Sequence, residues 1–253
     1  MVSILAIGNS FSRDATTYLH AIAQAGGIDC QVENLYIGGC SLEQHMFNVS
    51  QDLAAYTVDE NGETTERTAS IREALCRRAW THVTVQQASH DSGLPETYEP
   101  YLRQLCAVVR RYAPGCTLWL HETWAYETDS THSEFHRYGC DQAQMYRRLR
   151  EVYRAQAAAL SLPLIPCGDV IQALRRQPAF DYAHGGQSLC RDGFHMHLTY
   201  GRYAAAATWY ETLLRGDIRE NPFVPAGGGR ADPALLRTIR ETVHAVCAQE
   251  ARG

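Results

Sequence analysis

The chain alternates short runs rich in β-branched and aromatic residues with longer amphipathic stretches. We expect strands, most of them followed by a helix, at residues 2–7, 31–37, 82–87, 116–122 and 163–166. This alternation is typical of a parallel sheet whose strands are joined by crossover helices. The pattern therefore predicts the α/β fold class.

The expected helices lie between these strands and after the last one. They cover residues 14–24, a segment beginning at Ser41, and residues 70–79, 98–112, 141–160, 170–176, 201–214 and 232–250. Residues 56–68 contain an Asn-Gly step between threonine-rich flanks, which predicts an inserted hairpin. Because no repeat and no linker is visible, we expect residues 1–253 to form one domain, with a core over about 2–214 and the last helix packed outside it.

Composition and charge exclude several other classes. Of the 253 residues 45% are hydrophobic, which is typical of a globular protein, and the net charge of −5 argues against nucleic acid or an anionic membrane as a partner. No apolar run reaches the roughly 18–20 residues of a membrane helix. The first residues have no basic segment or cleavage site, and nine cysteines occur without a Cys-x-x-Cys pair. These features predict a cytoplasmic protein with reduced thiols, and they predict no particular oligomeric state.

Polar clusters follow the predicted strands, where ligands bind in open parallel sheets. They occupy residues 8–12, 38–41, 86–91 and 121–124, and a fifth cluster lies at 191–197. Ser10 stands at a strand-to-helix turn, where backbone N–H groups and the helix dipole can stabilise an oxyanion. A serine nucleophile needs a base and a group that orients the base, and His195 and Asp192 could supply these roles.

Together these residues resemble the SGNH/GDSL hydrolase superfamily of serine esterases and lipases. Its first block, Gly-Asp-Ser-x-Ser, is similar to residues 8–12, and its last block, Asp-x-x-His, is similar to residues 192–195. The resemblance implies a three-layer, flavodoxin-like α/β/α sandwich with five parallel strands in the order 2-1-3-4-5. It also implies Ser10 as nucleophile, His195 as base, Asp192 as its orienting acid, and Gly39 beside Ser10 in the oxyanion hole.

The third block of the superfamily, Gly-x-Asn-Asp, is absent here. The segment QQASHD stands in its place and resembles branches of the superfamily with a glutamine-rich third block, such as the sialate O-acetylesterase type. We expect the Gln87 amide to complete the oxyanion hole, and His90 is the rival donor. Asn9 replaces the usual aspartate of the first block, and we count it and His90 among the residues that contact substrate.

Trp124 and Tyr126 belong either to the core or to the wall of the substrate pocket, and we include them in the predicted binding site. The resemblance implies a metal-free, cofactor-free serine esterase acting on a small-molecule ester, most simply an acetyl or other short acyl group on a carbohydrate or similar polar molecule. A metal site at His184, His195 and His197 is the less favoured interpretation of the histidine-rich loop. The alternative from another class is a non-catalytic, flavodoxin-like module that binds a phosphate or nucleotide at the first turn.

Overall fold

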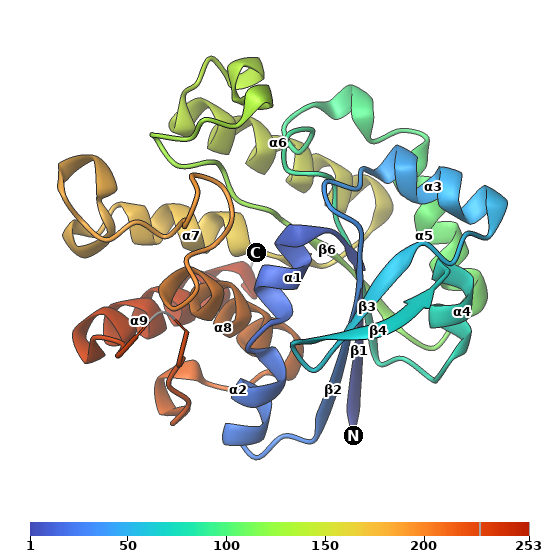
Figure 1. Ribbon diagram of the computed structural model, residues 1–253, viewed down its shortest axis with the longest axis horizontal. Coiled ribbons are helices and arrows are strands. Elements are labelled where there is room, and N and C mark those ends of the chain that lie inside the picture. Colours follow the sequence, from blue (N-terminus) through green and yellow to red (C-terminus); the bar gives the residue numbers. More distant parts are fainter. Residues whose placement is uncertain (228, 253) are drawn as a thin grey trace.

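A mostly parallel seven-stranded sheet organises the chain, with helices on both of its faces (Figure 1). The computed structural model describes residues 1–227 and 229–252. In spatial order the strands are β4 (Glu63–Ala69), β3 (Tyr56–Glu60), β2 (Cys30–Tyr36), β1 (Val2–Gly8), β5 (His82–Val85), β6 (Thr117–His121) and β7 (Leu164–Ile165). The five strands from β2 to β7 in this order are parallel, which confirms the predicted arrangement.

The sheet is wider than predicted because the inserted hairpin joins it. Strand β3 pairs with β2 in antiparallel fashion and β4 pairs with β3, so that five expected strands become seven. Asn61 and Gly62 form the turn with φ values of 53° and 90°. A two-residue turn with both φ values positive matches the twist of a hairpin, and asparagine followed by glycine adopts it at least cost.

The helices form a layer on each face of the sheet. Their bounds are α1 (Ser10–Thr16), α2 (Leu19–Ala25), α3 (Leu42–Gln51), α4 (Ile71–Cys76), α5 (Tyr101–Tyr112), α6 (Gln142–Leu160), α7 (Cys167–Arg175), α8 (Tyr200–Leu214) and α9 (Pro233–Glu250). Helices α1, α2, α7 and α8 lie on one side of the sheet and α3, α4 and α5 on the other (Figure 1). Because both faces are covered, residues Ile4 to Ile7 of β1 are all fully buried.

Two elements differ from the predicted ones for local chemical reasons. The helix expected over residues 14–24 is two helices, and it begins earlier, at Ser10. The hydroxyl groups of Thr16 and Thr17 donate to carbonyl oxygens of the preceding turn, a contact that favours a bend or an end of a helix. Strand β7 has only two residues because Pro163 and Pro166, which have no backbone N–H, flank it.

Helix α9 packs against α7 and α8 on the side away from the sheet (Figure 1). Its apolar face contributes buried side chains such as Ile239 and Val243. None of the helices over residues 1–227 and 229–252 is long and apolar enough to cross a membrane.

Candidate active site

The turn after β1 presents Ser10 at the first position of α1. Asn9 caps this helix, because its side-chain oxygen accepts a hydrogen bond from the Phe11 N–H at 3.0 Å. The Ser12 hydroxyl closes the capping box by accepting from the Asn9 N–H. The Ser10 side chain itself remains partly exposed. A rigid turn therefore holds a hydroxyl group at the carboxyl edge of the sheet.

Two backbone N–H groups near this turn are free to bind an oxyanion. Within the described residues, neither the Ser10 N–H nor the Gly39 N–H donates a hydrogen bond to another protein atom. Gly39 is exposed and has a φ of +64°, in the left-handed region that favours glycine. The Asn9 side chain donates to the carbonyl oxygen of Cys40 at 3.1 Å, which joins the Gly39 segment to the Ser10 turn.

Asp192 and His195 form a hydrogen-bonded pair on a tight loop, residues 190–197, which we call the His195 loop. The Asp192 carboxylate contacts Nδ1 of His195 at 2.7 Å, and its other oxygen accepts from the His195 backbone N–H at 2.8 Å. Burial alone would raise the pKa of Asp192, but these hydrogen bonds outweigh it and hold the pKa below the usual value. An ionised Asp192 fixes the His195 tautomer that carries its proton on Nδ1, which leaves Nε2 free to accept one.

Aromatic side chains bring this loop to the start of α1. The ring of Phe11, next to Ser10, lies with its centroid 6.2 Å from that of His195 and stacks on Trp124 at 4.2 Å. The Trp124 indole N–H donates to the carbonyl oxygen of Phe194 at 2.8 Å. The structure therefore brings Ser10, Asp192 and His195 into one region.

Asn9 lies beneath the surface of the site as a support of the turn, which differs from its predicted place among the residues that contact substrate. It is almost fully buried, and its side chain is used as a helix cap and as a support for the turn. The Asn9 side-chain oxygen also accepts a hydrogen bond from the Gln86 amide nitrogen at 2.9 Å. The Gln86 oxygen therefore faces His121 and accepts a hydrogen bond from its Nδ1 at 2.7 Å. Burial lowers the pKa of His121 to about 3, so a neutral imidazole holds this chain of hydrogen bonds.

Gln87 is also placed differently from the prediction. Its side-chain oxygen accepts from the backbone N–H groups of Leu42 and Ala88, and its amide donates to the carbonyl and hydroxyl oxygens of Thr97. These four hydrogen bonds, at 2.8–3.0 Å, use the amide fully in a position that is 0% exposed. The Gln87 amide therefore has no donor left for an oxyanion.

Trp124 and Tyr126 are core residues and do not line the surface of the site, a third correction. Both are fully buried. Trp124 packs on Phe11, and the Tyr126 hydroxyl contacts that of Ser89 at 2.9 Å. Their position directly after a strand suggested a place in the site. Their large side chains instead pack between the loops beneath it.

His90 is partly exposed near the site, beside a histidine that the sequence analysis did not single out. The ring of His132 stacks on His90 at 6.1 Å between centroids and meets Phe194 edge to face at 4.8 Å. Burial, together with the nearby His90 and His195 rings, lowers the pKa of His132. Because His132 comes from the polar stretch after β6, 42 residues from His90, only the packing of the aromatic rings reveals it.

The histidines considered as metal ligands do not come together. His184 is 82% exposed and pairs with Asp181, His195 pairs with Asp192, and His197 stacks on Tyr200. The predicted alternative of a metal at His184, His195 and His197 is therefore not supported by their placement.

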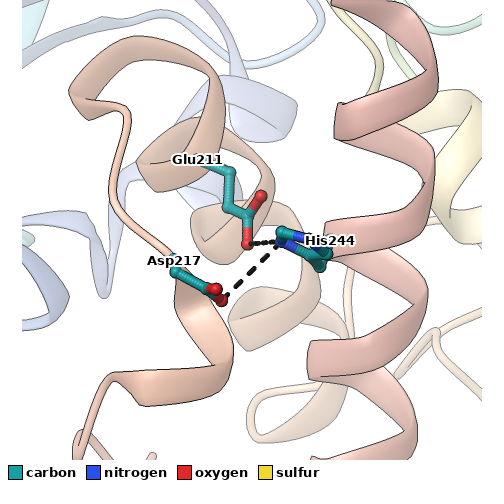
Figure 2. A group of neighbouring side chains, drawn as sticks. All are labelled: Glu211, Asp217 and His244. Carbon is teal, nitrogen blue, oxygen red and sulfur yellow. Dashed lines mark hydrogen bonds and ion pairs between the residues drawn. The ribbon is translucent and has the colours of Figure 1, made fainter.

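A different group of side chains has the spacing of metal ligands, at the junction of α8 and α9. Figure 2 shows His244 facing both Glu211 and Asp217, with Nδ1 3.2 Å from the Glu211 carboxylate and 3.7 Å from that of Asp217. The same atoms already have protein partners: Glu211 accepts from the Ile218 N–H, and Asp217 pairs with Arg219, which holds the pKa of Asp217 at about 2. We assign these contacts to the packing of α9 on α8.

This architecture is the fold of the SGNH hydrolases. A proposed SGNH hydrolase from Slackia heliotrinireducens aligns with a TM-score of 0.59 at 21% identity, covering 84% of this chain and 98% of that one. The acetylxylan esterase Axe2 from Geobacillus stearothermophilus aligns with a TM-score of 0.52 at 12% identity, covering 85% and 93%.

The chain belongs to the family described as domain of unknown function DUF4886, whose model matches residues 3–241. A DUF4886 family protein from Bacteroides uniformis is 35% identical, and its crystal structure aligns with a TM-score of 0.89 over 98% of this chain and 95% of that one. No curated protein matches the sequence.

Proposed function

We propose that the protein is a serine esterase that removes a short acyl group, most simply acetyl, from a carbohydrate or similar polar alcohol. The observation that carries this proposal is the Asp192–His195 pair, with its contact of 2.7 Å, next to the helix start at Ser10. A pair of this kind beside a partly exposed serine is the arrangement that activates a hydroxyl group.

In the proposed reaction the Ser10 Oγ attacks the ester carbonyl carbon while Nε2 of His195 takes its proton. The tetrahedral intermediate then collapses, the bond to the alcohol oxygen breaks, and His195 returns the proton to that oxygen. Water attacks the acyl-enzyme with the same proton transfers and releases the carboxylic acid. Asp192 stabilises the imidazolium that forms in each half of the cycle.

The oxyanion hole that we propose has two backbone donors, the Ser10 and Gly39 N–H groups. Donors aimed at the developing charge stabilise the transition state more than the ground state. Because the Gln87 amide is used elsewhere, His90 is the side chain that remains as a third donor. A His90→Ala variant tests this role, since loss of a third donor lowers kcat by about ten- to a thousand-fold.

The preference for a polar, short-chain ester rests on the surroundings of the pair. Phe194 contacts His195, His132 contacts Phe194, and His90 stacks on His132; all three are partly exposed and offer imidazole and aromatic faces, which suit a hydroxyl-rich group. The similarity in fold to an acetylxylan esterase agrees with this preference. A phosphate-binding module, the alternative from another class, would leave the Asp192–His195 pair without a role.

The experiment compares hydrolysis of p-nitrophenyl acetate by the wild type and by matched variants. Ser10→Ala and His195→Ala should each lower kcat by about three orders of magnitude or more. His184→Ala is the control, because Asp181 and His184 have the same spacing and a contact of 2.9 Å but lie on an exposed turn. If Ser10→Ala and His195→Ala hydrolyse the ester as fast as His184→Ala, the proposal is wrong. A bound nucleotide released on denaturation would favour the phosphate-binding module.

A further inference from the structure

Asp14 is a buried carboxylate that joins the helix carrying Ser10 to the His195 loop. It lies on α1 four residues after Ser10 and is 1% exposed. One of its oxygens accepts from the backbone N–H of Met196 at 2.8 Å, next in sequence to His195. No step of the reaction described above uses this residue.

Two arginines complete the surroundings of Asp14. Arg191, within the His195 loop, contacts the carboxylate at 2.9 Å, and Arg202 of α8 contacts it at 2.8 Å. Arg191 also donates to the carbonyl oxygen of Met196. A buried carboxylate is stable in its charged form only with such partners. Asp14 therefore holds α1, the His195 loop and α8 together.

In the described part of the chain, other hydrogen bonds of the His195 loop do not involve α1. Gly193, with a φ of +84°, accepts from the Glu127 N–H at 2.7 Å, and the Arg191 N–H donates to the His195 carbonyl at 2.9 Å. These contacts fix the shape of the loop but do not connect it to α1. Within the described residues, the polar contacts between α1 and the His195 loop all pass through Asp14.

We propose that Asp14 is a positioning residue, which sets the distance between the His195 imidazole and the Ser10 hydroxyl. This inference rests on the proposed function. One turn of helix, about 6 Å for four residues, separates Ser10 from Asp14 on the same side of α1, so the carboxylate transmits the position of the helix to the loop. A misplaced base slows proton transfer without weakening binding of the ester, since reaction depends on geometry more steeply than binding does.

Asp14→Asn tests the proposal, because it keeps the size of the side chain and removes its charge. We expect kcat for p-nitrophenyl acetate to fall by about ten- to a hundred-fold while KM changes less than about three-fold, since the loss belongs to the transition state. The Asp14→Glu variant keeps the charge and should recover part of this loss.

Asp59→Asn is the matched control. Asp59 is also a buried carboxylate, and it also holds α1, through contacts of 2.8 and 2.9 Å with Arg13, but it connects the helix to β3 and not to the His195 loop. We expect Asp59→Asn to lower the melting temperature about as much as Asp14→Asn does. Its kcat should nevertheless stay within about three-fold of the wild type. Equal losses of kcat in Asp14→Asn and Asp59→Asn would overturn the proposal.

Hydrogen exchange of the peptide over residues 190–197 separates this inference from the proposed function. We expect faster exchange in Asp14→Asn than in Asp59→Asn, because only the first variant replaces one of the two oxygens that accept from the Met196 N–H, Arg191 and Arg202 by an NH2 group, which accepts no hydrogen bond. If the wild type proves to have no esterase activity but the exchange differs in this way, the proposed function is wrong and Asp14 still positions the loop. Unchanged exchange in Asp14→Asn would contradict the inference whatever the activity.

Discussion

Replacing Gln87 by methionine should destabilise the fold while leaving the chemistry intact. Methionine has a similar length and fills the same space, but it offers the N–H groups of Leu42 and Ala88 no comparable acceptor. Both residues are fully buried, so each unpaired N–H costs about 1–3 kcal/mol. The free energy of unfolding should therefore fall by about 2–6 kcal/mol, a large part of the roughly 5–15 kcal/mol of a typical domain.

Urea denaturation followed by tryptophan fluorescence measures this loss. With a slope of about 3 kcal/mol/M, the midpoint should move down by about 0.7–2 M. Gln24→Met, at an exposed position on α2, is the control and should leave the midpoint unchanged. If the proposed function is right, the folded Gln87→Met protein should keep a kcat within about three-fold of the wild type, because the amide is fully used by Leu42, Ala88 and Thr97. Wild-type stability combined with a hundred-fold lower kcat would refute this reasoning and return Gln87 to the oxyanion hole.

Two further predictions concern titratable groups. The lowered pKa of Asp192 means that its ionised form stabilises the fold above about pH 4, the usual value in the unfolded chain, and that this contribution is lost as the pH falls through the lower native value. The stability difference between the wild type and Asp192→Asn should accordingly be largest near neutral pH and disappear in acid; a difference that grows in acid would contradict it. Burial raises the pKa of Cys40 to about 12, so iodoacetamide at pH 8 should modify the exposed Cys76 and Cys140 and spare Cys40. Rapid modification of Cys40, next to Gly39, would instead point to a thiol nucleophile.

The parallel strands could be predicted because their signal is local. Strands covered on both faces appear as apolar runs, and the turns between them contain glycine, proline or asparagine. The place of the hairpin could not be predicted, because the Asn-Gly step fixes the turn but says nothing of the sheet edge that β3 joins. The pairing of β3 with β2 depends on tertiary contacts, which the local sequence does not reveal. This pairing gives the sheet seven strands where five were expected.

Gln86 and Gln87, which directly follow β5, differ in their surroundings for a physical reason. Side chains alternate between the two faces of an extended chain, so neighbouring glutamines point to opposite sides. In β5 both Val83 and Val85 are fully buried and Thr84 is almost as buried, so no polar face marks the side on which the site lies. The sequence could therefore predict that a glutamine supports the site, but not which one.

The three residues of the predicted triad could be proposed from the sequence because each lies in a short local motif. Asp14 and His132 have none: Asp14 meets its arginine partners 177 and 188 positions away, and His132 reaches the site only through aromatic packing. Charged residues on short helices are ordinarily solvated, so nothing in the sequence marks Asp14 as buried.

Labelling with a fluorophosphonate probe, followed by peptide mapping, tests the central claim most directly. The probe reacts with a serine only where a base activates the hydroxyl group, and it requires no knowledge of the substrate. We predict a single phosphonylated peptide that contains Ser10, with labelling lost in Ser10→Ala and strongly slowed in His195→Ala but not in His184→Ala. A wild-type protein that is not labelled, or that is labelled at another serine, would contradict the assignment of Ser10 as the nucleophile.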